Sequence, residues 1–202
     1  MRRAMALVAV ALTVIGPSSA PAAEKTPQVE RTKIGGVTPA EEAAAEKYFG
    51  NTELLDQNGR ARHFFNDLLR RRKVLINFAF TSCSGACPVM AQNLVRVQEL
   101  LRQQGEQATI LTITVDPEND TPAVLKQYAA KYKAGPGWFF LTGTPENVTS
   151  VLERLGGKVR QPSEHTAKLL IGDTSTGMWV KTVATESPET IAHLVKHLND
   201  PK

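Results

Sequence analysis

The two cysteines of the chain, Cys83 and Cys87, are four residues apart and directly follow an apolar run over residues 74–80. This run predicts a buried strand, and the residues after Cys87 have helical spacing, so the pair lies where a strand turns into a helix. A thiolate near a helix N-terminus is stabilised by the helix dipole, which lowers its pKa and makes it a better nucleophile and metal ligand.

At this spacing on a helix the two Cα atoms are about 6 Å apart, which lies within the range that a disulfide spans. Cys83 and Cys87 can therefore close a disulfide or hold one soft metal ion. A purely structural disulfide is the less favoured interpretation, because a bridge across so short a loop removes little conformational entropy from the unfolded chain.

Residues 1–22 have the order of a secretory signal peptide. Two arginines precede an apolar stretch over residues 4–16, and Ala20-Pro21-Ala22 supplies an A-x-A cleavage site. The apolar stretch is shorter than the roughly 20 residues that cross a bilayer comfortably, and an uncleaved anchor is the alternative. We expect an exported, periplasmic protein, in a compartment where disulfides persist, with membrane contact only if this segment is uncleaved.

The composition favours one domain. Residues 23–47 are rich in Ala, Glu, Thr and Pro and lack aromatic residues, which predicts a flexible tether with one short helix near residues 39–47. The domain itself is expected over residues 48–202, a length that can bury a full core. The formal charge is +4, and +2 once Arg2 and Arg3 are subtracted, which is too weak an excess to indicate a nucleic acid partner.

Strand and helix patterns alternate through this domain. An Asn58-Gly59 turn between short strand candidates predicts a hairpin near its N-terminus. Strands are expected over 74–80, 108–115 and 138–141, and helices over 87–104, 122–133 and 145–156, followed by a hairpin of 168–171 with 179–183 and a helix over 188–198. This order predicts an α/β protein with a thioredoxin-like fold, a central mixed sheet flanked by helices, and an N-terminal β-hairpin extension.

Three separated blocks carry a family resemblance. Cys83-Ser84-Gly85-Ala86-Cys87-Pro88 has the form C-x-x-x-C-P, residues 115–122 read V-D-P-E-N-D-T-P, and His165 precedes an apolar strand. Residues 138–143 add a W-x-F-L-T-G stretch. In this order the blocks resemble the Sco/SenC family, which comprises copper-binding thioredoxin-like proteins of cytochrome c oxidase assembly. Gly85 departs from the family pattern, since many members have an acidic residue there.

The resemblance implies a copper site, for Cu(I) or Cu(II), whose ligands are Cys83, Cys87 and His165. It also implies a metallochaperone that delivers copper to the copper-centre subunit of a respiratory oxidase or to another periplasmic copper protein. The donor types agree with this, because cuprous copper prefers soft thiolates and accepts imidazole. A loop histidine without a ligand role is the alternative for His165. Gly85 leaves the ligands intact but removes a charge that can change thiol acidity or the choice of partner.

The alternative function is a thiol–disulfide oxidoreductase, in which Cys83 and Cys87 form a catalytic redox pair that reduces cysteines of a partner protein. Disulfide exchange needs two thiols and a docking loop, whereas copper retention needs a third donor such as His165. Apart from such reductase activity, we do not expect the protein to turn over a substrate. We expect Cys83 to be the more exposed thiol that reacts first, and Cys87 to be the buried resolving thiol.

The other histidines have weaker signals. His63 lies beside two phenylalanines and is expected to pack or to lie on the surface. His193 and His197 have the i, i+4 spacing that can chelate a metal, but no acid of the HExxH type lies between them. We therefore expect this pair to form part of a solvated helix face.

Three further residues have candidate roles near the cysteines or after the second strand. Met90 is a soft donor, but is expected to fill the core. Asp116 is expected either to form the turn before Pro117 or to orient a ligand from outside the metal's own coordination shell. Asp120 is expected to cap the helix that follows it.

Overall fold

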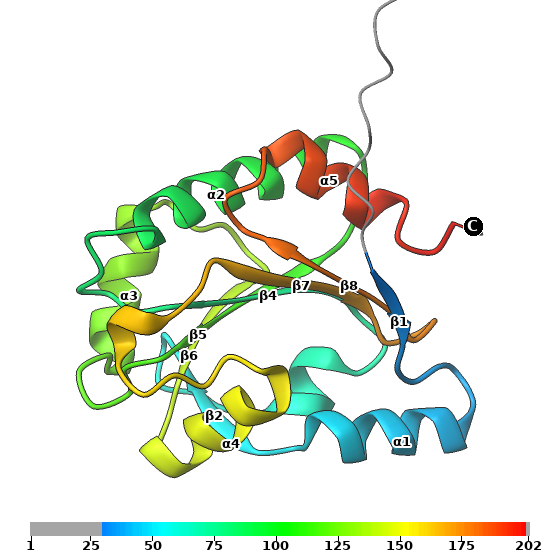
Figure 1. Cartoon of the computed structure of the whole chain (residues 1–202), viewed down its shortest axis with the longest axis horizontal. Coiled ribbons are helices and arrows are strands. Elements are labelled where there is room, and N and C mark those ends of the chain that lie inside the picture. Colours follow the sequence, from blue (N-terminus) through cyan, green and yellow to red (C-terminus); the bar gives the residue numbers. More distant parts are fainter. Residues whose placement is uncertain (1–29, 201–202) are drawn as a thin grey trace, which may run out of the picture.

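The computed structural model describes residues 30–200, which form one eight-stranded mixed sheet with helices on both faces (Figure 1). The strand order is β1-β8-β7-β4-β5-β6-β2-β3. The predicted α/β, thioredoxin-like fold is confirmed. The signal peptide or anchor expected within residues 1–22 lies outside the described residues. Between residues 30 and 200, no helix combines the length and apolar character needed to cross a membrane.

From α1 onward, the helices and strands follow the predicted order along the chain. The strands are β1 (Arg31–Lys33), β2 (Glu53–Asp56), β3 (Ala61–His63), β4 (Lys73–Ala79), β5 (Thr109–Thr114), β6 (Trp138–Thr142), β7 (Lys168–Asp173) and β8 (Met178–Val183). The helices are α1 (Pro39–Phe49), α2 (Cys87–Gln103), α3 (Pro122–Lys131), α4 (Pro145–Leu155) and α5 (Pro188–Lys196). Two short helical turns, η1 (Phe64–Leu69) and η2 (Pro162–Glu164), complete the set.

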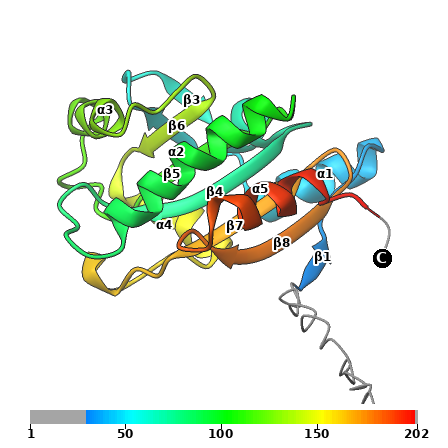
Figure 2. The same cartoon turned by 90° about the horizontal axis from the view of Figure 1, so that it is seen from above.

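The central strand β4 is buried on both faces, which explains its continuous apolar sequence. Val74, Ile76 and Phe78 belong to the core on the side of α1 and α4, and Leu75 belongs to the core under α2 and α5. Figure 2 shows α2 and α5 lying side by side above the sheet. Parallel pairing of β4 with β5 and of β5 with β6 brings the carboxyl ends of these strands to one edge.

The start of α2 differs from the other helix starts. At α1, α3, α4 and α5 a Thr or Ser side chain accepts a hydrogen bond from a backbone N–H of the first turn, and a proline follows. Ala86 precedes α2 and provides no side-chain cap. The positive end of the α2 dipole therefore faces the cysteine loop without a side-chain cap in between.

The predicted N-terminal hairpin is present at one edge of the sheet. β2 pairs with β3 through Leu55 and Ala61, and Gly59 has the positive φ of 74° that the turn requires. The Asp56 carboxylate accepts hydrogen bonds from the backbone N–H groups of Asn58 and Arg60. β2 also pairs with β6, so the hairpin extends the sheet beyond its parallel part.

The folded part begins earlier than the expected boundary at residue 48. β1 pairs with β8 at the opposite edge of the sheet, and Ala45 of α1 is buried in the core. The Phe49 ring lies 4.7 Å from the Trp179 ring, measured between centroids. Residues 31–33 and α1 therefore belong to the folded unit and not to a flexible tether.

Candidate metal centre

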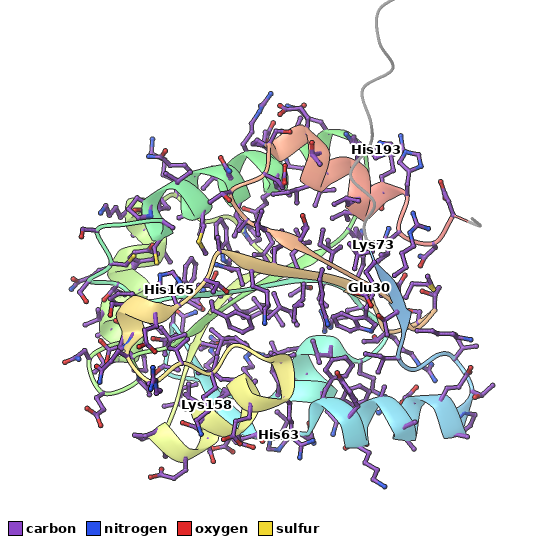
Figure 3. The ribbon with its side chains drawn as sticks, viewed as in Figure 1. Glu30, His63, Lys73, Lys158, His165 and His193 are labelled. Atoms are coloured by element: carbon purple, nitrogen blue, oxygen red, sulfur yellow. The ribbon has the colours of Figure 1, made fainter. Side chains whose placement is uncertain are left out.

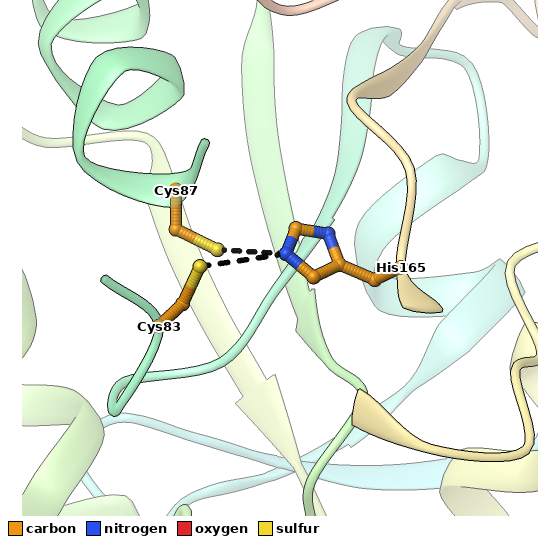
Figure 4. A group of neighbouring side chains, drawn as sticks. All are labelled: Cys83, Cys87 and His165. Atoms are coloured by element: carbon orange, nitrogen blue, oxygen red, sulfur yellow. Dashed lines mark hydrogen bonds between the residues drawn. The ribbon is translucent and has the colours of Figure 1, made fainter. Parts of the chain in front are cut away.

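The three predicted donors meet at one end of the sheet. Cys83 lies in the loop between β4 and α2, Cys87 is the first residue of α2, and His165 follows η2 just before β7. The His165 Nε2 atom is 3.2 Å from the Cys87 sulfur and 3.5 Å from the Cys83 sulfur (Figure 4). All three ligand atoms lie within 4.8 Å of one another, and residues 30–200 contain no other cluster of three such donors.

The sheet topology explains why residues so distant in sequence converge. β4 and β7 are antiparallel neighbours, with Asn77 opposite Leu169. The segment that leaves β4 and the segment that enters β7 therefore lie at the same edge. The first carries both cysteines and the second carries His165.

Burial distinguishes the two thiols. Cys87 is only 1% exposed, whereas Cys83 is half-buried. This difference in exposure agrees with the expected one, while the order of reactivity stays a prediction. Both residues are free cysteines in the structure.

Burial, together with a hydrogen bond with the Cys83 side chain, raises the pKa of the Cys87 thiol to about 12. This differs from the lowering that a position at a helix N-terminus predicts. In the metal-free protein, desolvation of the thiolate outweighs the helix dipole. A metal that binds Cys87 must therefore displace a proton from it.

The imidazole of His165 is held with Nε2 toward the sulfurs. Its Nδ1 lies 3.4 Å from the Thr166 carbonyl oxygen, which can only accept, so Nδ1 carries the proton and Nε2 keeps a free lone pair. The Phe80 ring packs edge-on against the imidazole at 5.3 Å between centroids. The His165 backbone N–H donates to Pro162 O at 3.1 Å, which fixes the turn that presents the ring.

Asp120 has a different role from the predicted helix cap. The side chain of Thr121, not Asp120, caps α3. Asp120 is 1% exposed, and its carboxylate accepts hydrogen bonds from the Thr81 backbone N–H at 3.2 Å, the Thr81 hydroxyl, and the Thr114 hydroxyl at 2.6 Å. It thus fastens the start of the cysteine loop to the end of β5. The only indication of this role in the sequence was the position of Asp120 in the V-D-P-E-N-D-T-P block, and the same residues also fit the pattern of a helix cap.

The remaining candidates lie outside the donor cluster. The Asp116 carboxylate accepts from the Asn119 side-chain amide at 2.9 Å, which fits the turn role among the two expected. Met90 is fully buried in the core, as predicted, and His63 is exposed at the end of β3. Figure 3 shows His193 at the far side of the molecule from His165.

Gly85 has no structural need to be glycine. Its φ is not positive, and a Cβ built there would meet only the Cys83 sulfur, at 4.0 Å. The position therefore has room for the acidic side chain that many Sco/SenC proteins carry.

Comparison with known proteins places these features in a family. A family model described as SCO1/SenC matches residues 40–199. The chain belongs to the SCO1/SenC family. A SCO2-like protein of Rickettsia prowazekii is 38% identical over 108 residues, which cover 54% of this chain and 51% of that protein. The match thus spans about half the length of this SCO1/SenC relative.

Solved structures of SCO1/SenC proteins have the same fold. Yeast Sco1 with copper bound superposes with a TM-score of 0.62 at 26% identity, covering 76% of this chain and 93% of that one. BsSco is described as having a disulfide switch and as a member of the Sco family of cytochrome c oxidase assembly proteins. It superposes with a TM-score of 0.62 at 25% identity, covering 74% of this chain and 92% of that one.

Proposed function

We propose that this protein binds one copper ion per chain through Cys83, Cys87 and His165. The observation that carries the proposal is the convergence of two sulfurs and one imidazole nitrogen within 4.8 Å. Thiolates select Cu(I), and imidazole is a compatible third ligand. The cluster offers three protein ligands, fewer than the four that a structural zinc site uses, which disfavours structural zinc. The copper bound to yeast Sco1 supports the same assignment.

We further propose that the protein is a periplasmic metallochaperone that passes copper to the copper-centre subunit of a respiratory oxidase. The signal-like order of residues 1–22 supports export. The place of BsSco among cytochrome c oxidase assembly proteins supports the recipient. Two of the donors, Cys83 and His165, are only half-buried, so the ligands of a recipient can reach the ion from their side.

The protein's own residues perform distinct tasks in this function. Cys87 holds its proton until an ion arrives, because burial disfavours its thiolate in the metal-free protein. Nε2 of His165 already has a free lone pair, and Asp120 keeps the loop that carries Cys83 in place. Copper is the cargo, and when bound it would provide a positive charge that compensates the buried Cys87 thiolate.

Thiol–disulfide exchange is the second candidate, favoured by the closeness of the two free thiols and by the disulfide switch of BsSco. Here the Cys83 thiolate attacks one sulfur of a partner's disulfide, which breaks the partner's S–S bond, releases its first thiolate to take up a proton and leaves a mixed disulfide. The Cys87 thiolate then closes the Cys83–Cys87 bond and releases the partner's second thiolate, which takes up a proton. The partner gains two electrons and this protein loses them. The raised pKa of Cys87 slows the second step near neutral pH.

Titration of the reduced protein with Cu(I) separates the two functions. We expect one tightly bound ion, and we expect His165→Ala to weaken binding at least tenfold. His63→Ala is the matched control, because His63 is exposed on β3, outside the donor cluster, and should leave binding unchanged. Unchanged affinity in His165→Ala would show that His165 is not a ligand. Two results together would favour the reductase. His165→Ala would still reduce a partner's disulfide, and wild-type protein purified from a copper-supplied periplasm would contain no copper.

A further inference from the structure

A histidine pair lies at the end of α5, away from the cysteines. The His197 backbone N–H donates to His193 O at 3.0 Å, so both residues share one face of a helical turn. Their rings are 4.3 Å apart between centroids, at an interplanar angle of 37°. His193 is exposed, and the His197 side chain is 39% exposed. Two imidazoles at this spacing on a helix are a recognised chelating arrangement.

A carboxylate beyond the end of the helix contacts one of the two imidazoles. The Nδ1 atom of His197 lies 2.6 Å from Oδ2 of Asp200. An ionised carboxylate can only accept, so Nδ1 of His197 carries the proton, and the Nε2 atom of the neutral ring keeps its lone pair for a ligand. Metal-binding histidines commonly donate their second N–H to a carboxylate in this way, which fixes the ring and increases its basicity.

Charges of both signs surround the histidine pair. The C-terminal end of α5 carries the negative end of the helix dipole, and Asp200 adds a negative charge. Arg31 and Lys196 are the opposing positive charges. The Arg31 guanidinium donates to the main-chain oxygens of Asp200 at 3.0 Å and of His197 at 3.4 Å, which leaves the Asp200 carboxylate to the imidazole.

We propose that His193 and His197 bind one divalent transition-metal ion, Cu(II) most tightly, with Asp200 orienting His197 and water completing the coordination. An ion with bonds of about 2 Å to two imidazole nitrogens needs both rings close together, and the centroids of these two rings are 4.3 Å apart. Among divalent ions, nitrogen donors bind Cu(II) most strongly. The donor set differs from the thiolate cluster, and Figure 3 shows His193 and His165 on opposite sides of the molecule. This second site therefore does not depend on the proposed function.

The test uses full-length protein with Cys83→Ser and Cys87→Ser, which removes the thiolate donors and makes the result independent of the first copper site. We expect one Cu(II) ion to bind with an electron paramagnetic resonance spectrum showing coupling to two nitrogens. Adding His193→Ala or His197→Ala should weaken binding at least tenfold. His63→Ala, which alters an exposed histidine on β3, should leave it unchanged.

The role of Asp200 has its own variants. Asp200→Ala should weaken Cu(II) binding about tenfold, while Asp200→Asn keeps an acceptor for Nδ1 and should lose less. In wild-type protein already loaded with one equivalent of Cu(I), added substoichiometric Cu(II) should broaden the ring NMR signals of His193 and His197 before that of His63, which provides a reading if the cysteine variant folds poorly. Equal Cu(II) affinity with and without the two imidazoles, or simultaneous broadening of all three rings, overturns the proposal.

Discussion

Gly85 lies between the two cysteines at a position where a side chain fits without displacing its neighbours. A carboxylate added there would face the Cys83 sulfur and disfavour its thiolate by repulsion between like charges. The acidity of the outer thiol is therefore adjustable by one substitution that leaves every donor atom in place.

We expect Gly85→Asp to slow the alkylation of Cys83 near neutral pH, because the added carboxylate disfavours the reacting thiolate, with little change in melting temperature. Gly85→Asn has nearly the same shape without the charge and is the matched control. The measurement is the pH dependence of the alkylation rate, with the adduct located by mass spectrometry. Equal rates for the Asp and Asn variants would contradict an electrostatic effect at this position.

Cys87 should make the stability of the metal-free protein depend on pH. Its pKa is raised to about 12 in the folded protein, so the unfolded chain loses the thiol proton first as the pH rises. The stabilisation is complete below the unfolded pKa of about 8.5. It decreases above that value, by at most about 1.4 kcal/mol per pH unit.

We therefore expect the unfolding free energy to fall from pH 8 to pH 10 more steeply in wild-type protein than in Cys87→Ser. Urea denaturation of both proteins under reducing conditions measures the difference. Groups that titrate in both proteins cancel in the comparison. Parallel pH profiles would mean that the Cys87 thiol is not desolvated in the folded state.

At the scale of elements, the loop after β5 supports the loop after β4. Asp120 receives three hydrogen bonds from Thr81 and Thr114, and it is almost fully buried. Loss of a buried acceptor leaves its donors without partners, at a cost of about 1–3 kcal/mol for each donor that stays dry. The position of Cys83 therefore depends on a residue that does not touch the sulfur cluster.

We expect Asp120→Ala to lower the unfolding free energy by about 3 kcal/mol and to weaken copper binding, because the Cys83 loop is no longer fixed. Asp120→Asn keeps part of the hydrogen bonding and should lie between wild type and Ala in both measurements. Urea denaturation and Cu(I) titration of the three proteins provide the test. A loss of stability with unchanged copper affinity would limit Asp120 to a role in folding.

The elements near the cysteines could be predicted because their signals are local. β4 is mostly apolar and α2 has apolar residues at helical spacing, and their observed bounds differ from the expected ones by a residue at most at either end. The role of Asp120 could not be derived in this way, because its partner Thr81 lies 39 residues earlier and the same Asp-Thr-Pro sequence also fits a helix cap. His165 required the family resemblance, since an isolated loop histidine carries no local signal of its partners.

At the scale of the whole molecule, β1 was missed for a related reason. Its three residues, Arg31–Lys33, are polar and are defined by pairing with a strand near the other end of the chain. The Trp179 indole N–H donates to Ile34 O at 3.3 Å, and Arg31 reaches the end of α5. β1 therefore covers part of an edge of the sheet that would otherwise be open.

We expect a chain that starts at Thr38, and so keeps the cap of α1, to melt at a lower temperature than a chain that starts at Glu30. A loss of about 2 kcal/mol would lower the melting temperature by roughly 4–8 °C. The shorter chain should also aggregate more readily, because the edge of β8 is exposed. Copper affinity should be equal in the two chains, since the sulfur cluster lies at the other end of the sheet. Equal melting temperatures would show that β1 does not contribute to the fold.

The unequal distribution of the three donors along the chain sets an order for ligand exchange. Both sulfurs belong to one short segment, whereas the imidazole comes from 78 residues beyond Cys87, on a segment with only the turn η2 before it. In the proposed function we infer that transfer begins by displacement of His165, the donor whose movement disturbs the least structure. A recipient protein must then approach over the η2–β7 side, and copper removal by a competing chelator should be faster in His165→Ala than in wild type.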